Sequence, residues 1–368
     1  MRYLFVITGI GYGHCTRDIS LINEIKKRDK KAKFLIAGYL TSYDFFKKHG
    51  FSVIRIEGED FSGEEFKFKV FRVAKKNWDL PVKWTKDILT LISAIRDFKA
   101  DFVVVDWEPV GIIASVITKT KFVVIFNYDT ESFLDFTKRF KLSKSNIIQH
   151  RVVINIYSLS SKYSKAIFIP SLKKGRKGSF HFVDFIVRQK PSDFADEDVL
   201  LGKLNLKRKP IIVMLGGSNY GSPLFSKMLK YLYLYDEDFL VFGYKKKFTK
   251  RNIRSLGFKD NYLEYLKASK GVITLAGHSG FEECAVFRKP CLIFPIIDHV
   301  EQTLNALEIE KLNFARVCFL KDLNNKQISN ALKDFITNLD KLDYEANKLR
   351  VFGNGARQIT TFLLRHKD

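Results

Sequence analysis

Residues 274–306 carry the residue types that a phosphate-and-sugar site needs. An apolar run typical of a buried strand ends at Leu275, the turn after it contains Gly277 and Gly280, and helical spacing follows. A helix N-terminus offers unpaired N–H groups and partial positive charge, which suit a diphosphate. Because ligands of an open parallel sheet bind beyond the carboxyl ends of its strands, we expect a phosphate site at this turn.

Polar side chains of the same segment could hold the rest of such a ligand. Glu283 stands in the first turn of the helix, where its carboxylate can accept hydrogen bonds from ribose hydroxyls; alternatively it is a solvated acid that complements the helix dipole. Ser279 and Glu282 match a capping box, so Glu282 is expected to be structural. Asp298 and Gln302 follow the next strand and could bind sugar hydroxyls, or they could cap the helix that begins there.

A second glycine turn, Gly216-Gly217-Ser218, follows the apolar run 211–215 directly. Its form is that of a phosphate-binding turn, although an ordinary turn between a strand and a helix has the same residues. It becomes a candidate phosphate site because the Gly277 turn follows another strand of the same half of the chain. The sequence therefore predicts two phosphate-binding turns in that half.

A third glycine-rich turn, with Gly11 and Gly13, follows the first apolar run and ends in His14. A dinucleotide site would need an acid at the end of the second strand, where residues 37–39 are Ala-Gly-Tyr, so no nicotinamide cofactor is expected. Asp106 ends the run Phe-Val-Val-Val-Asp and should emerge at the same sheet edge as His14. A carboxylate there can orient an imidazole base; the alternatives are a structural histidine and an aspartate that caps the next helix.

These residues lie in a chain whose apolar runs alternate with helical patterns, as expected of strands followed by helices. Strand-like runs of the first half are 3–7, 34–37, 52–56, 102–105 and 122–126. The alternation restarts at 211–215 and continues through 239–242, 272–275 and 291–294. The polar residues between the halves are typical of a linker. The pattern predicts an α/β fold of two parallel sheets, each within its own domain.

Composition limits the classes of partner. The 368 residues include 63 Lys and Arg against 40 Asp and Glu, a formal charge of +23, which favours phosphorylated ligands, anionic lipid or nucleic acid. Nucleic acid is not expected, since the lysines are spread and no Arg-rich arm or aromatic RNA-binding signature is present. The four cysteines form no CxxC pair, which predicts neither disulfides nor structural zinc and favours a reducing cytoplasm.

Any contact with a membrane should be peripheral. The N-terminus runs straight into a strand and lacks the order of a signal peptide. No apolar stretch has the roughly 18 to 20 residues that span a bilayer. Residues 66–72 alternate apolar and basic side chains, and Trp78 and Trp84 follow them. This run is either a basic, aromatic surface for anionic lipid or an amphipathic strand followed by a core-facing helix.

The residues from Gly277 onward resemble the donor-binding half of GT-B glycosyltransferases. The motif is G-H-S-G-x-x-E ending at Glu283, a proline seven residues later, and P-x-x-D-H-x-E-Q-x-x-N-A starting at Pro295. The likeness is to the family of the bacterial lipid-intermediate N-acetylglucosaminyltransferase and to the UDP-glycosyltransferases of small molecules. It implies that Glu283 binds the donor ribose and Gln302 the sugar. The donor-binding residues expected in all are Gly216, Gly217, Ser218, Gly277, His278, Ser279, Gly280, Glu283, Asp298 and Gln302.

The resemblance extends to the N-terminal half. The turn at Gly11 and Gly13 resembles the first glycine-rich loop of the family. His14 and Asp106 match the histidine that many small-molecule members use as catalytic base and the aspartate that pairs with it. The implied fold is GT-B, with two Rossmann-like doubly wound domains facing across a cleft. The expected parts are an acceptor domain at 1–188, a linker at 189–209, a donor domain at 210–352 and a tail helix at 353–368 that returns to the first domain.

The resemblance implies a hexosyltransferase that moves a sugar from a UDP-type donor to a hydroxyl acceptor, such as a lipid or polysaccharide, with inversion at the anomeric carbon. No cofactor and no metal are expected. Asp236 and Asp238 have the spacing of a metal-binding pair, but they follow a tyrosine-rich helix and are interpreted as a solvated loop. The expected compartment is the cytoplasm, with peripheral contact at the inner face of the cell membrane.

Two other functions compete with this interpretation. Non-hydrolysing UDP-sugar 2-epimerases carry an S-G-G-x-x-E-E motif close to residues 279–283, but their G-T-R-P-E first loop is replaced here by a turn ending in His14. The other alternative is a basic scaffold without catalysis that binds nucleic acid or anionic membrane. Strong, salt-dependent binding of nucleic acid without binding of a nucleotide sugar would favour the scaffold.

Overall fold

The computed structural model describes residues 1–61, 63, 65–216 and 219–366, and these fall into two compact units. The first unit comprises Met1–Phe61, Lys69–Arg188 and Asn354–Asp368, and the second comprises Ser62–Phe68 and Gln189–Gly353. The sequence predicted 62–68 within the first domain and a linker at 189–209. Both segments belong to the second unit, and the expected linker contains a 3₁₀ turn at Pro191–Asp193 and helix α8 (Glu197–Lys203).

The described part of the first unit is built on an eight-stranded sheet with strand order β3-β2-β1-β4-β5-β6-β8-β7. All neighbours are parallel except the hairpin of β7 and β8. The strands are β1 (Arg2–Ile7), β2 (Lys33–Gly38), β3 (Val53–Arg55), β4 (Phe102–Asp106), β5 (Phe122–Ile125), β6 (Ala166–Pro170), β7 (Gly175–Lys177) and β8 (Phe180–Val183). The central strands are rich in Val, Ile and Phe and are buried on both faces, as parallel sheets covered by helices require.

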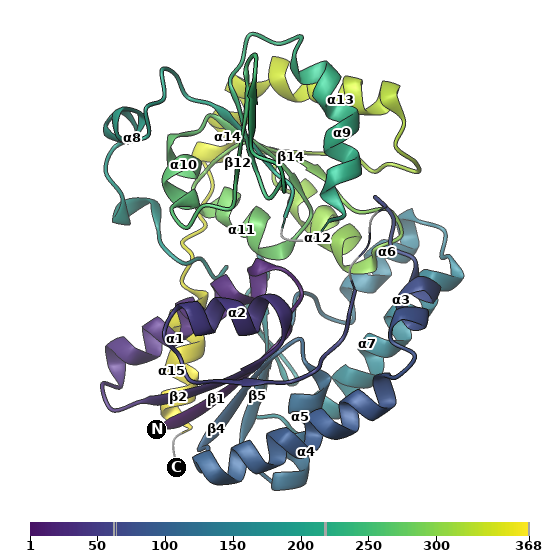
Figure 1. Cartoon of the computed structure of the whole chain (residues 1–368), viewed down its shortest axis with the longest axis vertical. Coiled ribbons are helices and arrows are strands. Elements are labelled where there is room, and N and C mark those ends of the chain that lie inside the picture. Colours follow the sequence, from purple (N-terminus) through teal and green to yellow (C-terminus); the bar gives the residue numbers. More distant parts are fainter. Residues whose placement is uncertain (62, 64, 217–218, 367–368) are drawn as a thin grey trace. The chain divides into compact units, whose positions relative to one another are not determined.

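Helices cover both faces of this sheet (Figure 1). One layer contains α1, α2 and α15, and the other contains α4, α5 and α7. The helices of this unit are α1 (Tyr12–Arg28), α2 (Leu40–Lys48), α3 (Val70–Lys76), α4 (Leu80–Phe98), α5 (Pro109–Thr118), α6 (Ser132–Arg139), α7 (Lys144–Tyr163) and α15 (Gly355–Arg365). From the far end of the chain, α15 packs beside α1, and its Ile359 and Leu363 join the core that contains Phe5 and Ile22.

The described part of the second unit has a seven-stranded sheet with strand order β11-β12-β10-β9-β13-β14-β15, parallel except for β11. The strands are β9 (Ile211–Met214), β10 (Phe239–Phe242), β11 (Phe248–Lys250), β12 (Ile253–Gly257), β13 (Gly271–Leu275), β14 (Cys291–Phe294) and β15 (Ala315–Val317). The remaining helices are α9 (Gly221–Leu232), α10 (Tyr262–Ala268), α11 (His278–Val286), α12 (Val300–Glu310), α13 (Asn325–Thr337) and α14 (Leu339–Asn347). The α/β fold with two doubly wound parallel sheets that the sequence predicted is confirmed.

The strand orders locate the binding edges. In the first sheet the order reverses at β1, which lies between β2 and β4; in the second it reverses at β9, which lies between β10 and β13. Doubly wound sheets bind ligands at the carboxyl ends of the strands where this reversal occurs. His14 and Asp106 follow β1 and end β4, while the Gly216 and Gly277 turns follow β9 and β13. Each group of expected site residues therefore lies at the reversal point of its own sheet.

Within the residues that the structure describes, no helix combines the length and the apolar character needed to cross a bilayer.

Candidate functional site

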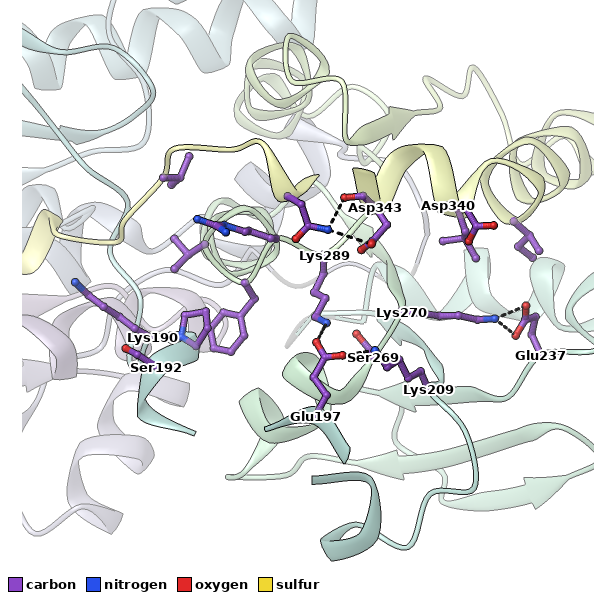
Figure 2. A pocket seen from close by; sticks show the side chains of 18 of the residues that line it. Lys190, Ser192, Glu197, Lys209, Glu237, Ser269, Lys270, Lys289, Asp340 and Asp343 are labelled. Atoms are coloured by element: carbon purple, nitrogen blue, oxygen red, sulfur yellow. Dashed lines mark hydrogen bonds and ion pairs between the residues drawn. The ribbon is translucent and has the colours of Figure 1, made fainter. Parts of the chain in front are cut away.

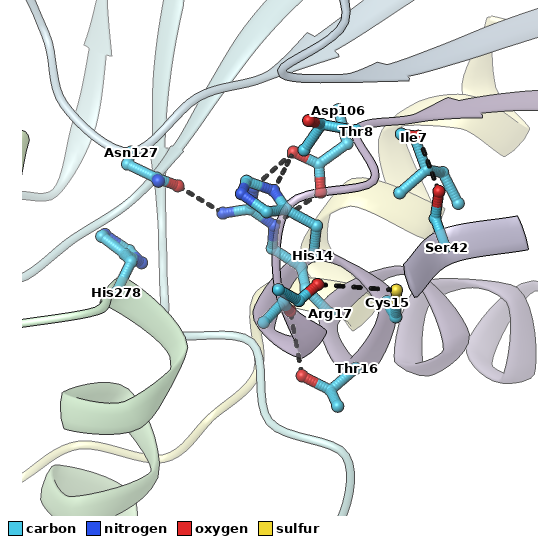
Figure 3. A network of polar contacts seen from close by, with 12 residues as sticks. Ile7, Thr8, His14, Cys15, Thr16, Arg17, Ser42, Asp106, Asn127 and His278 are labelled. Atoms are coloured by element: carbon cyan, nitrogen blue, oxygen red, sulfur yellow. Dashed lines mark hydrogen bonds and ion pairs between the residues drawn. The ribbon is translucent and has the colours of Figure 1, made fainter. Parts of the chain in front are cut away.

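His14 and Asp106, expected to pair, are in contact (Figure 3). Nδ1 of His14 and Oδ1 of Asp106 are 2.9 Å apart. The histidine side chain is 18 % exposed, whereas the aspartate is completely buried at the end of β4. When Nδ1–H donates to the carboxylate, Nε2 carries the lone pair. The pair therefore has the arrangement of a general base with an orienting carboxylate.

The glycines before His14 are needed for the path of the backbone. Gly11, the residue before the first turn of α1, has φ of 77°, a left-handed conformation that favours glycine. A Cβ on Gly9 would meet the backbone oxygen of Tyr39 at 2.2 Å. Helix α1 begins at Tyr12, directly after this turn, so Gly13 and His14 lie inside its first turn. This start aims the imidazole at the end of β4.

Three residues that the sequence analysis missed complete this network. Arg17 is 1 % exposed; its Nε donates to Oδ2 of Asp106 over 3.0 Å, and its Nη2 donates to Oδ1. Its Nη1 donates to Oδ1 of Asn127 over 2.6 Å, from the carboxyl end of β5 (Figure 3). Asp18, next in the helix, is completely buried. The spacing of His14 and Arg17, three residues apart on one helix, was the signal that could have found the arginine.

The pKa values of the two carboxyl groups of this network are shifted in opposite directions. Burial opposes the charge of Asp106, but the Arg17 guanidinium and the His14 ring outweigh it and hold the pKa of Asp106 below its usual range. Burial raises the pKa of Asp18 well above its usual range, and the Asp106 carboxylate raises it further. Their surroundings therefore shift the pKa values of these two aspartates in opposite directions.

The residues after Asp106 show local strain. Trp107 has φ of 52°, a conformation that bulky residues rarely adopt and that is often found at functional sites. Its ring packs edge-on against Phe126 with centroids 5.0 Å apart, and its indole N–H has no hydrogen-bond partner among the described residues. Glu108 is buried, and burial together with Glu59 raises its pKa well above its usual range. The β4–α5 connection thus places a strained aromatic residue beside the charged aspartate.

In the second unit, the turn after β13 leads directly into α11. Gly277 is the residue before the helix, and no side chain caps the helix start. A Cβ on Gly277 would meet nothing within 4 Å among the described residues, so there is open space at this end of the helix. The expected capping box of Ser279 and Glu282 is wrong. The helix begins at His278, so Ser279 already lies within the first turn and cannot act as its cap.

The polar side chains of α11 are more buried than expected. Glu282 is completely buried, with Oε1 3.2 Å from Nδ1 of His278, whose ring packs edge-on against Phe281. His278 itself is 4 % exposed and Glu283 is 7 % exposed. Glu283 is therefore not the solvated acid of the alternative interpretation. Its expected place in the first turn is also wrong, because α11 begins at His278 and has no acid in its first turn.

The second expected pair, Asp298 and Gln302, lies around the start of α12. The residue before that helix is His299, whose Nδ1 accepts from the Gln302 N–H over 3.4 Å, so Asp298 is not the cap. Gln302 Oε1 accepts from the N–H of Ile296 over 3.0 Å, which holds the loop after β14. Asp298 has φ of 60° and pairs with Nζ of Lys67 over 3.1 Å.

Lys67 belongs to a short segment that the sequence analysis did not connect with this loop. Lys67 forms a parallel bridge with Ile297, and the N–H of Phe68 donates to the Ile297 oxygen over 2.8 Å. The Phe68 ring is buried and lies 5.0 Å from the ring of His299. The alternation of apolar and basic residues in 66–68 therefore reflects strand-like pairing with the loop after β14.

The turn after β9 is described only in part, since Gly217 and Ser218 lie outside the described residues. Gly216 has φ of 73°, and a Cβ on Gly243 would meet its carbonyl oxygen at 2.4 Å. Two glycines thus allow the turns after β9 and β10 to approach closely.

A separate pocket of about 940 Å³ lies in the second unit, at the opposite edge of the sheet (Figure 2). Its lining includes Lys270 and Lys289, which stand just before β13 and β14. Lys289 Nζ pairs with Glu197 over 2.7 Å, and Lys270 pairs with Glu237. Because these charges neutralise each other at the amino ends of the strands, this pocket is not the expected donor site.

Comparison with known proteins agrees with the fold and the motifs. Residues 1–339 match the family described as Glycosyl transferase family 1. An uncharacterised glycosyltransferase of Methanosarcina acetivorans is 25 % identical over 349 residues, which cover 86 % of this chain and 85 % of the relative.

Two solved structures extend the likeness in fold over nearly the whole chain. MurG of Acinetobacter baumannii has a TM-score of 0.63 at 12 % identity and covers 99 % of this chain and 100 % of its own. The spinosyn rhamnosyltransferase SpnG complexed with thymidine diphosphate has a TM-score of 0.64 at 11 % identity, with the same coverage. The two-domain GT-B fold is thus confirmed. With its family motif, its sheets and its matched length in agreement, the chain belongs to Glycosyl transferase family 1 and is a glycosyltransferase.

Proposed function

We propose that this enzyme transfers a sugar from a UDP-type nucleotide-sugar donor to a hydroxyl acceptor, with inversion at the anomeric carbon and without a metal ion. The observation that carries the proposal is the contact of His14 with the buried Asp106 at the carboxyl ends of β1 and β4. Nε2 of His14 takes the proton of the acceptor hydroxyl. The acceptor oxygen then bonds to the anomeric carbon as the bond to the diphosphate oxygen breaks, and the electron pair leaves with the diphosphate.

The donor would bind at the reversal point of the second sheet. The N-terminus of α11 and the Gly216 turn offer backbone N–H groups to the diphosphate. Glu283 would accept hydrogen bonds from the ribose, and Asp298 and Gln302 would contact the sugar. The related fold of SpnG complexed with thymidine diphosphate supports a nucleoside diphosphate as the ligand class. The base is assigned to uracil from the motif resemblance.

Metal independence follows from how the leaving diphosphate would be stabilised. A helix N-terminus and a glycine turn supply fixed dipoles where negative charge develops. The acidic residues with metal-like spacing are engaged elsewhere: Asp236 pairs with Arg208 over 3.0 Å, and Asp238 pairs with the same arginine over 3.2 Å. Both interactions tie these acids to an arginine that lies shortly before the first strand of the unit.

Donor turnover tests this function with water in place of the acceptor hydroxyl. We would incubate the protein with UDP-hexoses and with dTDP- and GDP-hexoses, and measure the nucleoside diphosphate that slow hydrolysis sets free. Release of UDP that requires His14 and persists in EDTA is the expected result. Interconversion of UDP-sugars without lasting release of UDP would instead identify a 2-epimerase. A protein that neither binds nor turns over any nucleotide sugar would be a scaffold.

We also propose peripheral contact with anionic membrane through the first unit. Phe71 and Trp78 are 68 % and 82 % exposed, and Val82 is also exposed, on α3 and the start of α4. The exposed Ile148 and Val152 lie on α7, which packs beside α3 (Figure 1). Basic residues accompany these side chains on α3 and α4, as in surfaces that bind anionic lipid. They are Lys69, Arg72, Lys75, Lys76, Lys83 and Lys86.

Co-sedimentation with vesicles tests the membrane proposal. Binding to phosphatidylglycerol vesicles at low salt, absence of binding to phosphatidylcholine vesicles and a clear loss in Trp78→Ser are expected. The control is Leu234→Ser, which removes an equally exposed apolar side chain from the second unit. Equal binding by both variants, or none by the wild type, would contradict the proposal.

A further inference from the structure

The Arg17 side chain is almost completely buried, yet it carries a charge that the proton transfer itself does not require. It contacts both oxygens of Asp106, and its Nη2 lies 3.0 Å from Nδ1 of His14. A buried ion pair of this kind is weak evidence for added stability, because desolvation offsets most of the attraction. Its place against the expected base therefore calls for another explanation.

The charges that face His14 can be named from each element around it. Helix α1 contributes Arg17 and Asp18, whose pKa burial raises, and β4 contributes the Asp106 carboxylate. The end of β5 contributes Asn127, which is uncharged and holds the guanidinium over 2.6 Å. The arginine and the aspartate balance each other, so the imidazole faces an orienting carboxylate whose charge is compensated.

This balance matters because a carboxylate next to an imidazole has two opposing effects. It orients the ring and stabilises the imidazolium that forms during proton transfer. An uncompensated carboxylate would also keep the imidazole protonated at neutral pH, and a protonated ring cannot accept the acceptor's proton. A cation on the same carboxylate preserves the orientation and limits the unwanted protonation.

We propose that Arg17 is a positioning residue that compensates the Asp106 charge and thereby sets the pH range in which His14 is available as a base. Asn127 holds the guanidinium in place. This inference rests on the proposed role of His14 and deepens it. It assigns functions to residues that take no part in the bond-forming step.

The raised pKa of Asp18 predicts how a substitution of this residue should affect His14. Its carboxyl lies buried next to Arg17 in the sequence and close to Asp106, and it is not needed as a second counter-charge for one guanidinium. A neutral carboxylic acid and an amide have similar size and no charge. Asp18→Asn should therefore leave the titration of His14 unchanged, whereas loss of an ionised carboxylate would lower its midpoint.

Nuclear magnetic resonance of the imidazole tests the proposal directly and independently of turnover. The seven histidines are labelled with ¹⁵N, the His14 signals are assigned by their loss in His14→Gln, and their shifts are followed with pH. We compare the wild type with Arg17→Met and use Arg28→Met as the matched control. Arg28 lies on the same helix but is more exposed and pairs with Glu24 over 3.0 Å.

The expected result is a His14 midpoint that rises by about 1 to 3 pH units in Arg17→Met and stays unchanged in Arg28→Met. The acid limb of the turnover profile should move upward by the same amount in Arg17→Met, a change that a purely structural role would not produce. A folded Arg17→Met with an unchanged or lower midpoint would overturn the proposal.

A second comparison keeps the test decisive when Arg17→Met does not fold. In Asp106→Asn the arginine is left without its counter-charge, so the His14 midpoint should fall below that of the wild type. Adding Arg17→Met to that background removes both buried charges, which proteins usually tolerate, and should raise the midpoint again. Equal midpoints in the single and double variants would rule out an effect of Arg17 on His14.

The ¹⁵N shifts also separate this proposal from the proposed function. Protonated Nδ1 with a free Nε2 lone pair is the tautomer that the base needs. If Nδ1 instead accepts from Arg17, His14 is not the base and the proposed function fails, although the arginine is still in contact with the ring. If the tautomer is as expected and the midpoint does not respond to Arg17, only the present proposal fails.

Discussion

The two sheet edges that carry the candidate site are built in different ways. The edge of the first unit is a network of buried charged side chains, in which one imidazole contacts Asp106 and Arg17. The edge of the second unit is built from backbone turns and a helix N-terminus, with Gly216 and Gly277 at the decisive places. A base needs a side chain whose protonation is controlled, whereas a diphosphate needs many N–H groups at fixed positions. The difference agrees with our proposal that proton transfer belongs to one edge and donor binding to the other.

Removing the imidazole should have the largest effect. His14→Gln should lower UDP release from the donor by about 10²- to 10⁴-fold, because proton transfer to a positioned base contributes that much. The dissociation constant for UDP should stay within about twofold, which initial rates and calorimetry would show. His49→Gln, a histidine at the end of α2 outside the network, is the control. Parallel loss of UDP binding and turnover in His14→Gln would assign His14 to the donor site and remove the contrast between the edges.

Removing the Glu283 carboxylate, which is expected to bind the ribose, should weaken nucleotide binding and not the proton transfer. Glu283→Ala should weaken UDP by about 10- to 100-fold, since a hydrogen bond to a charged group contributes about 1.5 to 3 kcal/mol. Glu264→Ala is the control, because Glu264 is an acid on another helix of this unit and pairs with Lys203 over 2.6 Å. Unchanged UDP affinity in Glu283→Ala would show that α11 does not bind the ribose.

A substitution of Gly216 should show whether this glycine contributes to UDP binding as well as to the stability of the fold. Gly216→Ala forces an L residue into a left-handed conformation and should cost about 1 to 2 kcal/mol in the free energy of unfolding. It should also weaken UDP binding by several fold. Gly178→Ala imposes similar strain at φ of 57° in the β7–β8 turn and should destabilise the protein without changing UDP affinity. Equal affinities of the two variants would mean that the Gly216 turn does not contact the diphosphate.

The smallest effect concerns an acid of the first unit outside the His14 network. Burial raises the pKa of Glu59 to about 7, opposed by a hydrogen bond from the Trp84 indole N–H, 3.1 Å from Oε1. A raised carboxyl pKa stabilises the fold at low pH, and this contribution is lost as pH rises through about 7. Thermal unfolding should show a drop in Tm between about pH 4.5 and 7, the two ends of this pKa shift, that is smaller in Glu59→Gln by on the order of 1 to 2 °C.

The exposed neighbour Glu57 provides the control for this pH dependence. Glu57 pairs with Lys86 over 3.3 Å at the surface. Glu57→Gln should therefore leave the drop in Tm as it is in the wild type. A drop of the same size in all three proteins would show that Glu59 is ionised at no cost to the fold.

The sequence predicted the sheets and the contact of His14 with Asp106 because both depend on local patterns. The run Phe-Val-Val-Val-Asp identifies a buried strand and places Asp106 at its end. The glycine turn after the first strand places His14 just beyond the end of that strand. The spacing of His14 and Arg17 indicates that they are neighbours on one helix, but the contact of Arg17 with Asp106, which lies 89 residues away, is not encoded in local sequence. Its neighbours in sequence do not indicate whether it is buried.

The details of the second unit depended on contacts that local sequence does not encode. The Ser279–Glu282 spacing matched a capping box, but α11 begins at His278 because the turn after β13 ends there. Lys67 reaches Asp298 through pairing of 66–68 with the loop after β14, a segment far away in the sequence. This pairing depends on the tertiary structure. The local sequence shows that apolar and basic residues alternate, but it does not show which segment they pair with.

Calorimetric titration of UDP into the wild type, Glu283→Ala and His14→Gln tests most directly whether UDP binding depends on Glu283 and not on His14. The account predicts binding by the wild type, clear weakening in Glu283→Ala and unchanged affinity in His14→Gln. Absence of UDP binding by the wild type, or equal weakening in both variants, would contradict it.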